Sequence, residues 1–369
     1  MSLPRVLFLL AIGLLLGASP MLAANYAVGN CKPSLPSYPT ISAAVGAVPP
    51  GSTVLVCPNT YPEQVTIAQP LTLQGIASGN SSQAVITVPT GGLATTPSIT
   101  FGTVAPQVEV TSGSVNITNI TVDGTCGSSC SGAVSVGIYY GSGSSGTVNE
   151  ATVRNEGAGS CVGILAENGT ATNESVVIEN SSIHDVCLEA ILSSTNQTPP
   201  TLTVTIKGNY LESGYIGVYQ YVGAGPGSVT ANVVTGGSYG IVSAAPSITM
   251  SGNTVTNSPV GISIFASGNN ITSNKVWNSS GHGIEFPSGL TQSNFIVKSN
   301  VGIEFGCVTG NTVSHNTIND ASIGLDSVPS GFSGANSFDN VVTVRTDGCG
   351  FGPKLSARQY PAPIRAPAH

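Results

Sequence analysis

A short phrase that returns at a fixed interval constrains this chain more than any other feature. Between residues 209 and 342 the phrase Asn-x-aliphatic occurs seven times, in steps of 20 to 24 residues. In six copies a glycine followed by an aliphatic residue comes eight or nine positions later. Such a period is typical of a solenoid, in which each coil buries its apolar side chains against its neighbours. The asparagines are Asn209, Asn232, Asn253, Asn274, Asn294, Asn316 and Asn340, and the glycines are Gly217, Gly240, Gly261, Gly283, Gly302 and Gly324. We expect Asn119, Asn149 and Asn180 to continue the asparagine column towards the N-terminus.

The first residues have the pattern of a secretion signal. Arg5 is followed by an apolar run over 6–17 and by the small residues Ala23 and Ala24. The run is too short to span a bilayer and normal for a cleaved peptide. We therefore predict a signal peptide over 1–24, a solenoid domain over 25–352 and a proline-rich tail over 353–369. The mature protein is expected to be secreted, periplasmic or at the cell surface, with no membrane span.

The composition favours many short strands joined by tight turns. Charged residues make up only 7% of the chain, against 46 glycines and 40% hydrophobic residues. The formal net charge is −7, which argues against nucleic acid or anionic lipid as a partner. We expect a monomer.

Eight cysteines in an exported chain predict disulfides. Cys161 and Cys187 occupy nearly the same place in adjacent coils, which brings them within bridging range. The other predicted pairs are Cys31 with Cys57, Cys126 with Cys130, and Cys307 with Cys349.

The N-terminal part of the mature chain predicts a cap for the open end of the stack. Thr40 can cap a short amphipathic helix over 40–48 that places Ile41, Ala44 and Val45 on one face. Strands are expected in the three runs that follow, over 53–56, 61–67 and 71–75.

These runs resemble the start of a pectin-lyase-like right-handed parallel β-helix. They read Thr-Ile-Ser-Ala-Ala-Val at 40–45, Pro-Pro-Gly-Ser-Thr-Val-Leu-Val at 49–56, Thr-Tyr-Pro-Glu-Gln-Val-Thr-Ile at 60–67 and Pro-Leu-Thr-Leu-Gln-Gly at 70–75. The superfamily includes pectin methylesterases, pectate lyases, polygalacturonases and carbohydrate-binding repeat proteins. The resemblance implies an all-β, single-stranded β-helix with a stacked asparagine ladder at one turn. It also implies a polysaccharide or cell-envelope glycan as partner, bound beside the Gly-Ile strand.

Strand alternation separates inward from outward residues in the Gly-Ile segments. The residue after each glycine is aliphatic and is expected to face the core, so the next residue is expected to face outward. That outward file changes from neutral to acidic along the chain. It reads Tyr139, Leu165, Leu192, Tyr219, Val242, Ser263, Glu285, Glu304 and Asp326.

Three acids in file on neighbouring coils allow more than one interpretation. Neighbouring coils lie about 4.8 Å apart, so stacked carboxylates need solvent, a cation or a shared proton to offset their repulsion. Glu285, Glu304 and Asp326 are therefore candidates for a Ca²⁺ site or for the acid/base groups of a glycosidase. The structural alternative is a solvated polar edge.

His282 and three tyrosines complete the candidate site. Gly281-His-Gly-Ile284 resembles the Gly-His-Gly motif of polygalacturonases. The acidic and basic residues of that family's pattern are missing, so we do not expect polygalacturonase activity. His282 remains a candidate catalytic residue. Tyr139, Tyr219 and Tyr239 are candidates for a sugar-stacking surface on the same flank. We expect a protein that binds an extracellular polysaccharide. If it also cleaves the polymer, we expect a polysaccharide lyase or a glycoside hydrolase. The alternative is a non-catalytic surface or adhesion protein.

Overall fold

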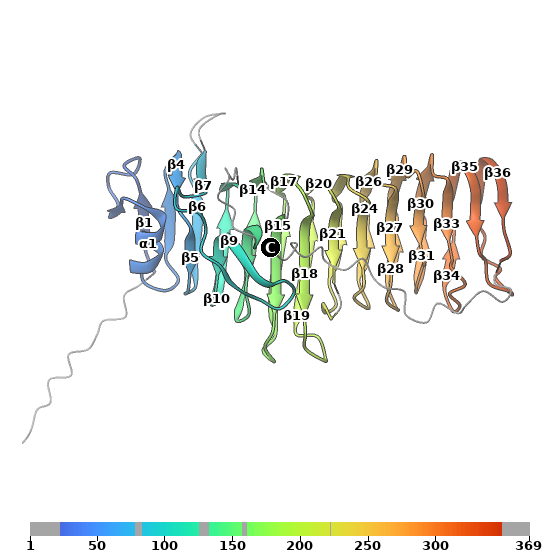
Figure 1. Ribbon diagram of the computed structural model, residues 1–369, viewed down its shortest axis with the longest axis horizontal. Helices are drawn as coiled ribbons and strands as arrows, with labels where there is room; N and C mark the ends of the chain where they lie inside the picture. Colours follow the sequence, from blue (N-terminus) through green and yellow to red (C-terminus); the bar gives the residue numbers. More distant parts are fainter. Residues whose placement is uncertain (1–22, 78–82, 125–132, 157–160, 222, 349–369) are drawn as a thin grey trace, which may run out of the picture.

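The protein is a right-handed parallel β-helix, drawn in Figure 1 as a long stack from α1 at one end to β36 at the other. The computed structural model describes residues 23–77, 83–124, 133–156, 161–221 and 223–348. The predicted signal peptide (apart from its last two residues) and the tail over 353–369 lie outside these residues. Among the described pairings every one is parallel except that of β8 with β9, as the solenoid period predicts.

One face of the stack is a 13-stranded parallel sheet. Its strands are β1 (Asn25–Val28), β2 (Ser37–Tyr38), β3 (Thr53–Val56), β6 (Leu71–Gly75), β10 (Gly113–Thr118), β13 (Ser144–Asn149), β16 (Glu174–Glu179), β19 (Leu202–Lys207), β22 (Ser228–Thr230), β25 (Thr249–Ser251), β28 (Asn270–Thr272), β31 (Leu290–Gln292) and β34 (Thr312–Ser314).

A second sheet, of 23 strands, forms the other two faces. One of these faces holds β4 (Asn59–Pro62), β7 (Ala84–Thr87), β11 (Thr121–Asp123), β14 (Thr152–Arg154), β17 (Ser182–Val186), β20 (Tyr210–Ser213), β23 (Val233–Gly236), β26 (Thr254–Thr256), β29 (Lys275–Trp277) and β32 (Phe295–Val297).

The third face carries the Gly-Ile segments and is called the Gly-Ile face below. It holds β5 (Val65–Ile67), β8 (Thr96–Ser98), β9 (Gly102–Val110), β12 (Val134–Tyr140), β15 (Cys161–Asn168), β18 (Glu189–Thr195), β21 (Ile216–Gln220), β24 (Tyr239–Ser243), β27 (Val260–Ile264), β30 (His282–Glu285) and β33 (Val301–Glu304). The long strands β35 (Thr317–Asp326) and β36 (Ser337–Arg345) run across both faces of the second sheet at the C-terminal end.

A short helix covers the N-terminal end of the stack, as predicted. Helix α1 (Ile41–Ala47) buries Ile41, Ala44 and Val45, and the Thr40 hydroxyl accepts a hydrogen bond from the Ala43 N–H at 3.1 Å. Glu63 reaches across to accept from the backbone N–H groups of Ile41 and Ser42, both at 2.8 Å. Its carboxylate thereby satisfies two amides that the first turn of a helix leaves without partners.

The asparagine ladder is present, with two corrections to its extent. From Asn209 to Asn316 each asparagine donates both its backbone N–H and its Nδ2–H to the Oδ1 of the asparagine one coil on, at 2.9–3.0 Å. The last acceptor is Asn336, whereas Asn340 is exposed and donates to Asp320. At the N-terminal end the Ser181 N–H donates to Asn209, so Ser181 rather than Asn180 aligns with the ladder.

The other two asparagines predicted to extend the ladder also lie outside it. Asn119 takes a left-handed backbone conformation and donates to the Gly75 carbonyl. Asn149 accepts from Asn180 at 2.9 Å in a separate exposed pair. In these longer coils the asparagine therefore stands before the ladder position, by one residue for Asn119 and Asn180 and by two for Asn149.

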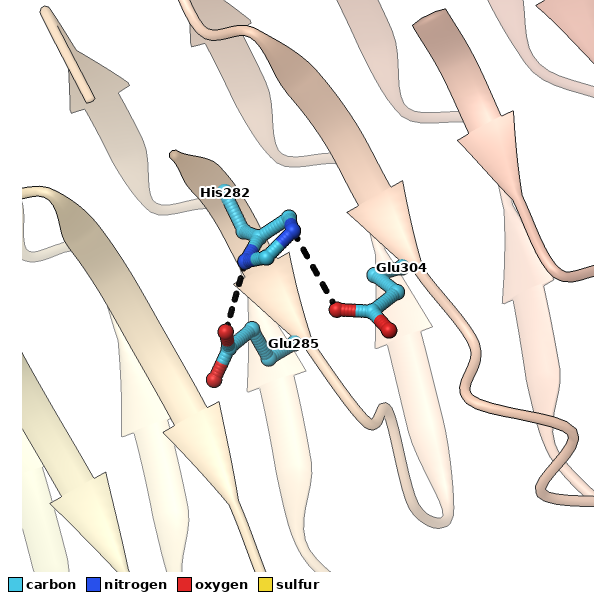
Figure 2. Close-up of side chains that lie close together, drawn as sticks. All are labelled: His282, Glu285 and Glu304. Atoms are coloured by element: carbon cyan, nitrogen blue, oxygen red, sulfur yellow. Dashed lines mark hydrogen bonds and ion pairs between the residues drawn. The ribbon is translucent and has the colours of Figure 1, made fainter. Parts of the chain in front are cut away.

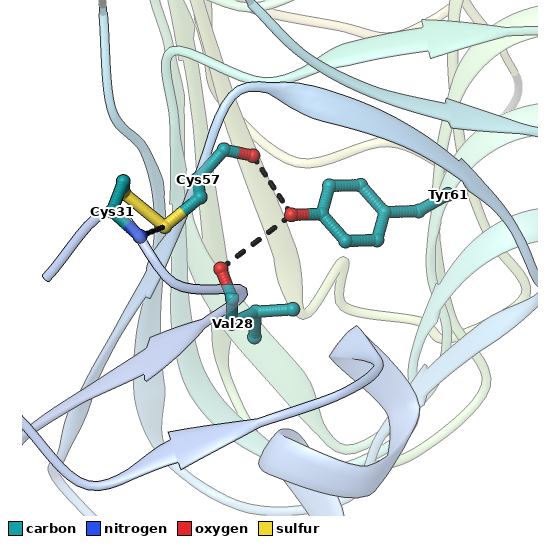
Figure 3. Close-up of a disulfide and its surroundings, with 4 residues drawn as sticks. All are labelled: Val28, Cys31, Cys57 and Tyr61. Carbon is teal, nitrogen blue, oxygen red and sulfur yellow. Dashed lines mark hydrogen bonds between the residues drawn. A yellow bond between two sulfur atoms is a disulfide. The ribbon is translucent and has the colours of Figure 1, made fainter. Parts of the chain in front are cut away.

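Two of the predicted disulfides are formed between described residues. Cys31 joins Cys57 with a Cα–Cα distance of 5.7 Å, and Cys161 joins Cys187 with 5.6 Å. Figure 3 shows the first, beside Tyr61, whose hydroxyl donates to the Cys57 carbonyl at 2.8 Å. Cys307 is also disulfide-bonded. Its predicted partner Cys349, and the predicted Cys126–Cys130 pair, lie outside the described residues.

The apolar residues form two separate clusters. The larger lies inside the coils and runs the length of the stack. The smaller lies on the outer side of the Gly-Ile face and includes Tyr139, Leu165, Leu192, Tyr219 and Val242. No described helix is long and apolar enough to cross a membrane.

Candidate functional site

Three acids stand side by side at the C-terminal end of the Gly-Ile face, as strand alternation predicts. Glu285 ends β30, Glu304 ends β33 and Asp326 ends β35. The strand register pairs Glu285 with Glu304, and Glu304 with Asp326. The same register pairs Ser263 with Glu285, so the change from neutral to acidic falls between β27 and β30.

His282 lies between two of these acids. Its Nδ1 is 2.6 Å from Glu285 Oε1 on the same strand, and its Nε2 is 3.3 Å from Glu304 Oε2 on the next coil. Figure 2 shows the imidazole bridging the two carboxylates across the strand edges. The sequence marked all three residues as candidates but did not predict that the imidazole joins the acids.

A break in strand alternation puts His282 on the same side as Glu285. A Cβ placed on Gly283 would lie 2.4 Å from the Cγ2 of Ile296, a core residue, so this position faces inward. Ile284, the next residue, is also fully buried in the inner core. Two successive inward residues leave the flanking His282 and Glu285 both facing outward.

The charges around His282 favour its protonated form. The hydrogen bond that His282 donates to Glu285 is the largest influence that raises the pKa of His282; the charges of Glu285, Glu304 and Asp326 raise it further, whereas burial lowers it. The side chains of Glu285 and Glu304 are 10% and 17% exposed, so water screens these interactions only in part. An imidazolium is therefore the cation that offsets the stacked acids.

Carboxylate oxygens of Glu285 and Asp326 accept hydrogen bonds from hydroxyl groups. The Ser263 hydroxyl donates to Glu285 Oε2 at 2.8 Å, which fixes the second oxygen of that carboxylate. Asp326 accepts hydrogen bonds from the hydroxyls of Thr346 and Ser327. Asp326 thus continues the file but points its carboxylate towards β36 and does not join the His282 group.

His282, Glu285 and Glu304 also form the group of potential metal ligands among the described residues. One donor atom from each lies within 4.8 Å of the other two. An imidazole with two carboxylates suits Zn²⁺ or Cu²⁺ better than Ca²⁺, which prefers oxygen ligands alone. The donor set that the structure brings together therefore differs from the all-oxygen set of Glu285, Glu304 and Asp326 expected for Ca²⁺.

We expected Tyr139 and Tyr219 to face solvent, and this prediction is wrong. Tyr139 is 4% exposed and Tyr219 is fully buried, because the outer side of the Gly-Ile face is itself covered in the N-terminal half. The Tyr139 hydroxyl lies 3.0 Å from Glu167 Oε2 and donates to Glu167 and to the Pro97 carbonyl. Facing outward from a strand is therefore not equivalent to facing solvent.

A β-hairpin accounts for the burial of Tyr139. Strand β8 pairs antiparallel with the start of β9, and the backbone N–H groups of Ile99 and Thr100 donate to Glu167, as does the Ser98 hydroxyl. One buried carboxylate thus pins the hairpin over the outer cluster. Charge-assisted bonds of this kind are about twice as strong as neutral ones.

Tyr239 keeps its place as a candidate ligand contact, and Tyr215 joins it. Both rings are half-buried against the outer cluster, with centroids 6.1 Å apart in an edge-to-face arrangement. The Glu285 charge contributes to the raised pKa of Tyr239, after burial. Tyr239 therefore lies within electrostatic reach of the acidic site.

Comparison with solved structures shows proteins of similar fold. The structure is similar to a GH136 lacto-N-biosidase from Eubacterium ramulus, with a TM-score of 0.59 and 12% identity over 87% of this chain and 68% of that one. It is similar to the Dettilon tailspike protein, with a TM-score of 0.51 and 13% identity over 82% of this chain and 63% of that one. The chain thus spans less than two thirds of the tailspike. At these identities the likeness establishes the pectin-lyase-like right-handed β-helix and nothing finer.

A narrower match covers the C-terminal part of the chain. The family model described as periplasmic copper-binding protein (NosD) matches residues 196–352, which is under half of the sequence. This span contains His282, Glu285, Glu304 and Asp326. Among curated protein sequences, none matches this chain.

Proposed function

We propose that the protein is exported, binds a polysaccharide on the Gly-Ile face and hydrolyses it at His282, Glu285 and Glu304. The observation that carries this proposal is the imidazole held between two carboxylates of adjacent strands. A proton donor whose pKa is raised by its neighbours, beside a carboxylate, is the pair that glycoside hydrolysis requires. Two disulfides between described residues support export to an oxidising compartment.

The geometry suggests separate roles for the three side chains. Glu285 holds Nδ1 of His282 and favours the imidazolium, as the carboxylate of a catalytic triad orients its histidine. His282 Nε2–H, which faces Glu304, then serves as the proton donor. Glu304, the more exposed of the two glutamates, serves as the nucleophile.

The reaction balances as a double displacement. Glu304 forms a bond to the anomeric carbon while the glycosidic C–O bond breaks, and the leaving oxygen takes the proton of His282. Water then cleaves the glycosyl ester and returns a proton to His282. Each displacement inverts the anomeric carbon, so the product keeps the configuration of the substrate, as in retaining glycosidases.

The choice of a glycan rests on two supports. The sequence resembles a superfamily whose members act on polysaccharides, and its fold is similar to that of a lacto-N-biosidase. The site also lies on the face that carries the substrate cleft in the resembling families.

The test is turnover by wild type and by paired variants. The mature protein is incubated with xylan, a mixed-linkage β-glucan, galactan, polygalacturonate and alginate, and new reducing ends are counted. The proposal predicts release by wild type and a loss of at least about 10³-fold in Glu304→Gln, the size of loss typical for a residue that acts directly in the chemistry. Asp320→Asn, an exposed acid on the neighbouring face, is the control and should keep full activity. Binding without turnover, unchanged in Glu304→Gln, would instead favour the non-catalytic surface protein.

A second candidate function is binding of a divalent metal ion by the same three side chains. It is supported by the donor set of His282, Glu285 and Glu304. The model of a periplasmic copper-binding protein also matches the span that contains them. A bound ion would take the place of the proton on one imidazole nitrogen, and would supply Lewis-acid or redox chemistry there.

Calorimetric titration with Cu²⁺, Zn²⁺ and Ca²⁺ separates these possibilities. Binding of Cu²⁺ or Zn²⁺ that is lost in His282→Gln supports the nitrogen-containing site. Binding of Ca²⁺ that survives His282→Gln but is lost in Asp326→Asn supports the all-oxygen site. Heat changes that none of these substitutions alters would exclude both.

A further inference from the structure

One file of the Gly-Ile face links the candidate site to the aromatic pair. The strand register places Glu189 beside Ile216, Ile216 beside Tyr239, Tyr239 beside Val260, and Val260 beside His282. These residues lie in the outward column one position before each Gly-Ile pair. At about 4.8 Å per strand, Tyr239 is about 10 Å from His282 along the helix axis.

The two tyrosines in this region form a braced pair. The Tyr215 ring meets the Tyr239 ring edge to face, with an interplanar angle of 87°, and both pack against the outer apolar cluster. Because each ring restricts the other and both are partly exposed, the pair offers a preformed surface for a pyranose ring. Its position lies N-terminal to the catalytic candidates.

A buried carboxyl group ends the file. Glu189 is fully buried, and apart from its own peptide N–H neither oxygen has a hydrogen-bond partner. The Tyr215 N–H donates to the carbonyl of Leu188, the residue before Glu189, at 3.2 Å, so Glu189 lies close to the aromatic pair. Buried polar groups without a hydrogen-bond partner are rare in proteins, which singles out the carboxyl group of Glu189 on this face.

The charge of the face selects against polyanions. Glu285 and Glu304 stand at the C-terminal end of this path, and the strands β5 to β33 of the Gly-Ile face carry no lysine or arginine. Asp326 on β35 adds a further acid at the C-terminal end. A polymer with a carboxylate on each sugar would meet like charges along this path, whereas a neutral glycan would not.

We infer that the site takes an uncharged glycan, whose chain lies along the helix axis from His282 over Tyr239 and Tyr215 towards Glu189. This inference deepens the proposed function and rests on it. Tyr239 and Tyr215 then determine the affinity for the glycan and the preference for longer glycan chains, although they do not contact the bond that is cleaved. An uncharged glycan also implies hydrolysis rather than elimination, because a lyase needs a uronic acid beside the bond that it cleaves.

Binding and turnover are measured separately so that the two proposals can fail independently. Affinity for xylan, mixed-linkage β-glucan, galactan, polygalacturonate and alginate is measured in Glu304→Gln, with EDTA and with added Ca²⁺. We expect binding to at least one neutral polymer and none to the polyuronates. Tyr215→Ala and Tyr239→Ala should each weaken that binding about five- to tenfold. Tyr210→Ala, an exposed tyrosine on the neighbouring face, should not.

Kinetics on chains of different length test the direction of the chain. In the protein with Glu304 intact, Tyr215→Ala and Tyr239→Ala should raise KM more for the long polymer than for a short oligosaccharide. The inference would be overturned if the protein preferred a polyuronate or bound none of the neutral polymers. Binding that both tyrosine substitutions leave unchanged would also overturn it. Binding of a neutral polysaccharide that depends on the tyrosines, but without any turnover, would support the inferred glycan site and refute the proposed cleavage.

Discussion

The Nδ1 of His282 lies 2.6 Å from the Oε1 of Glu285, three residues further along the same strand. In a regular strand two residues three apart point to opposite sides. Here both face outward because Gly283 and Ile284 both face the core. The His282–Glu285 contact is therefore a consequence of the same packing that requires the glycine.

Glu285→Gln should lower the pKa of His282. The hydrogen bond to this carboxylate is the largest cause of the raised pKa, so removing the negative charge of Glu285 should lower the pKa of His282. NMR titration of the imidazole measures the change directly. Asp326→Asn removes only a more distant charge and should give a smaller shift. Equal shifts in the two variants would contradict this account.

The same substitution predicts a change in the pH profile. If His282 donates a proton during turnover, activity falls as pH rises through its pKa, above the ordinary value of 6.5. In Glu285→Gln this alkaline limb should move to lower pH by the shift that the titration measures. An alkaline limb that does not move would exclude His282 as the acid.

Stability should fall as pH rises from 5 to 9. Burial raises the pKa of Glu189 and of Glu156 from 4.5 to about 8. Between these values the folded protein binds more protons than the unfolded chain, so each group's contribution is lost with rising pH. The raised pKa of His282 acts in the same direction above pH 6.5. Urea unfolding at pH 5, 7 and 9 tests this, and Glu189→Gln should flatten the decline.

Removing one rung of the asparagine ladder should destabilise the fold strongly. Asn253 accepts from both nitrogens of Asn232 and donates to Asn274 and to the Val229 carbonyl. Asn253→Ala leaves buried donors unsatisfied, each at about 1–3 kcal/mol, so we expect a loss of about 3–5 kcal/mol in the free energy of unfolding. Asn300→Ala, at an exposed asparagine, serves as the control and should change it by less than about 0.5 kcal/mol.

A methyl group on the glycine column should also be costly. The Cβ of Gly261→Ala would lie 2.4 Å from Val276 Cγ1 and 2.5 Å from the Gly283 carbonyl oxygen. Overpacking of this kind typically costs about 1–3 kcal/mol. Gly46→Ala, in α1 with open space around it, should be neutral or stabilising by about 0.5–1 kcal/mol. Thermal unfolding of the two variants compares them, and equal effects would refute the packing argument.

The periodic features could be predicted from the sequence because they repeat. The period predicts the parallel coils, and the column of residues after Gly-Ile predicts that Glu285, Glu304 and Asp326 stand in file. The capping helix and the Cys161–Cys187 bridge follow from local patterns. Each of these depends on a position within one coil.

Features that depend on contacts between coils, or on a departure from strand alternation, could not be predicted in the same way. The outward direction of His282 depends on two successive inward residues, which a simple alternation excludes. The burial of Tyr139 depends on a hairpin that Glu167 holds from β15, two strands along the stack from β9. Asn340 stands in the right phrase but four residues past the ladder, where Asn336 takes the rung. In each case a non-local contact decides the outcome.

The stereochemistry of hydrolysis tests the central claim most directly. Proton NMR follows the anomeric signal of the first product released from a neutral glycan by the wild-type protein. Because Glu304 is assigned as the nucleophile of a double displacement, the account predicts a product that keeps the anomeric configuration of the substrate, and no product from Glu304→Gln. A product of inverted configuration, or turnover that survives Glu304→Gln, would contradict it.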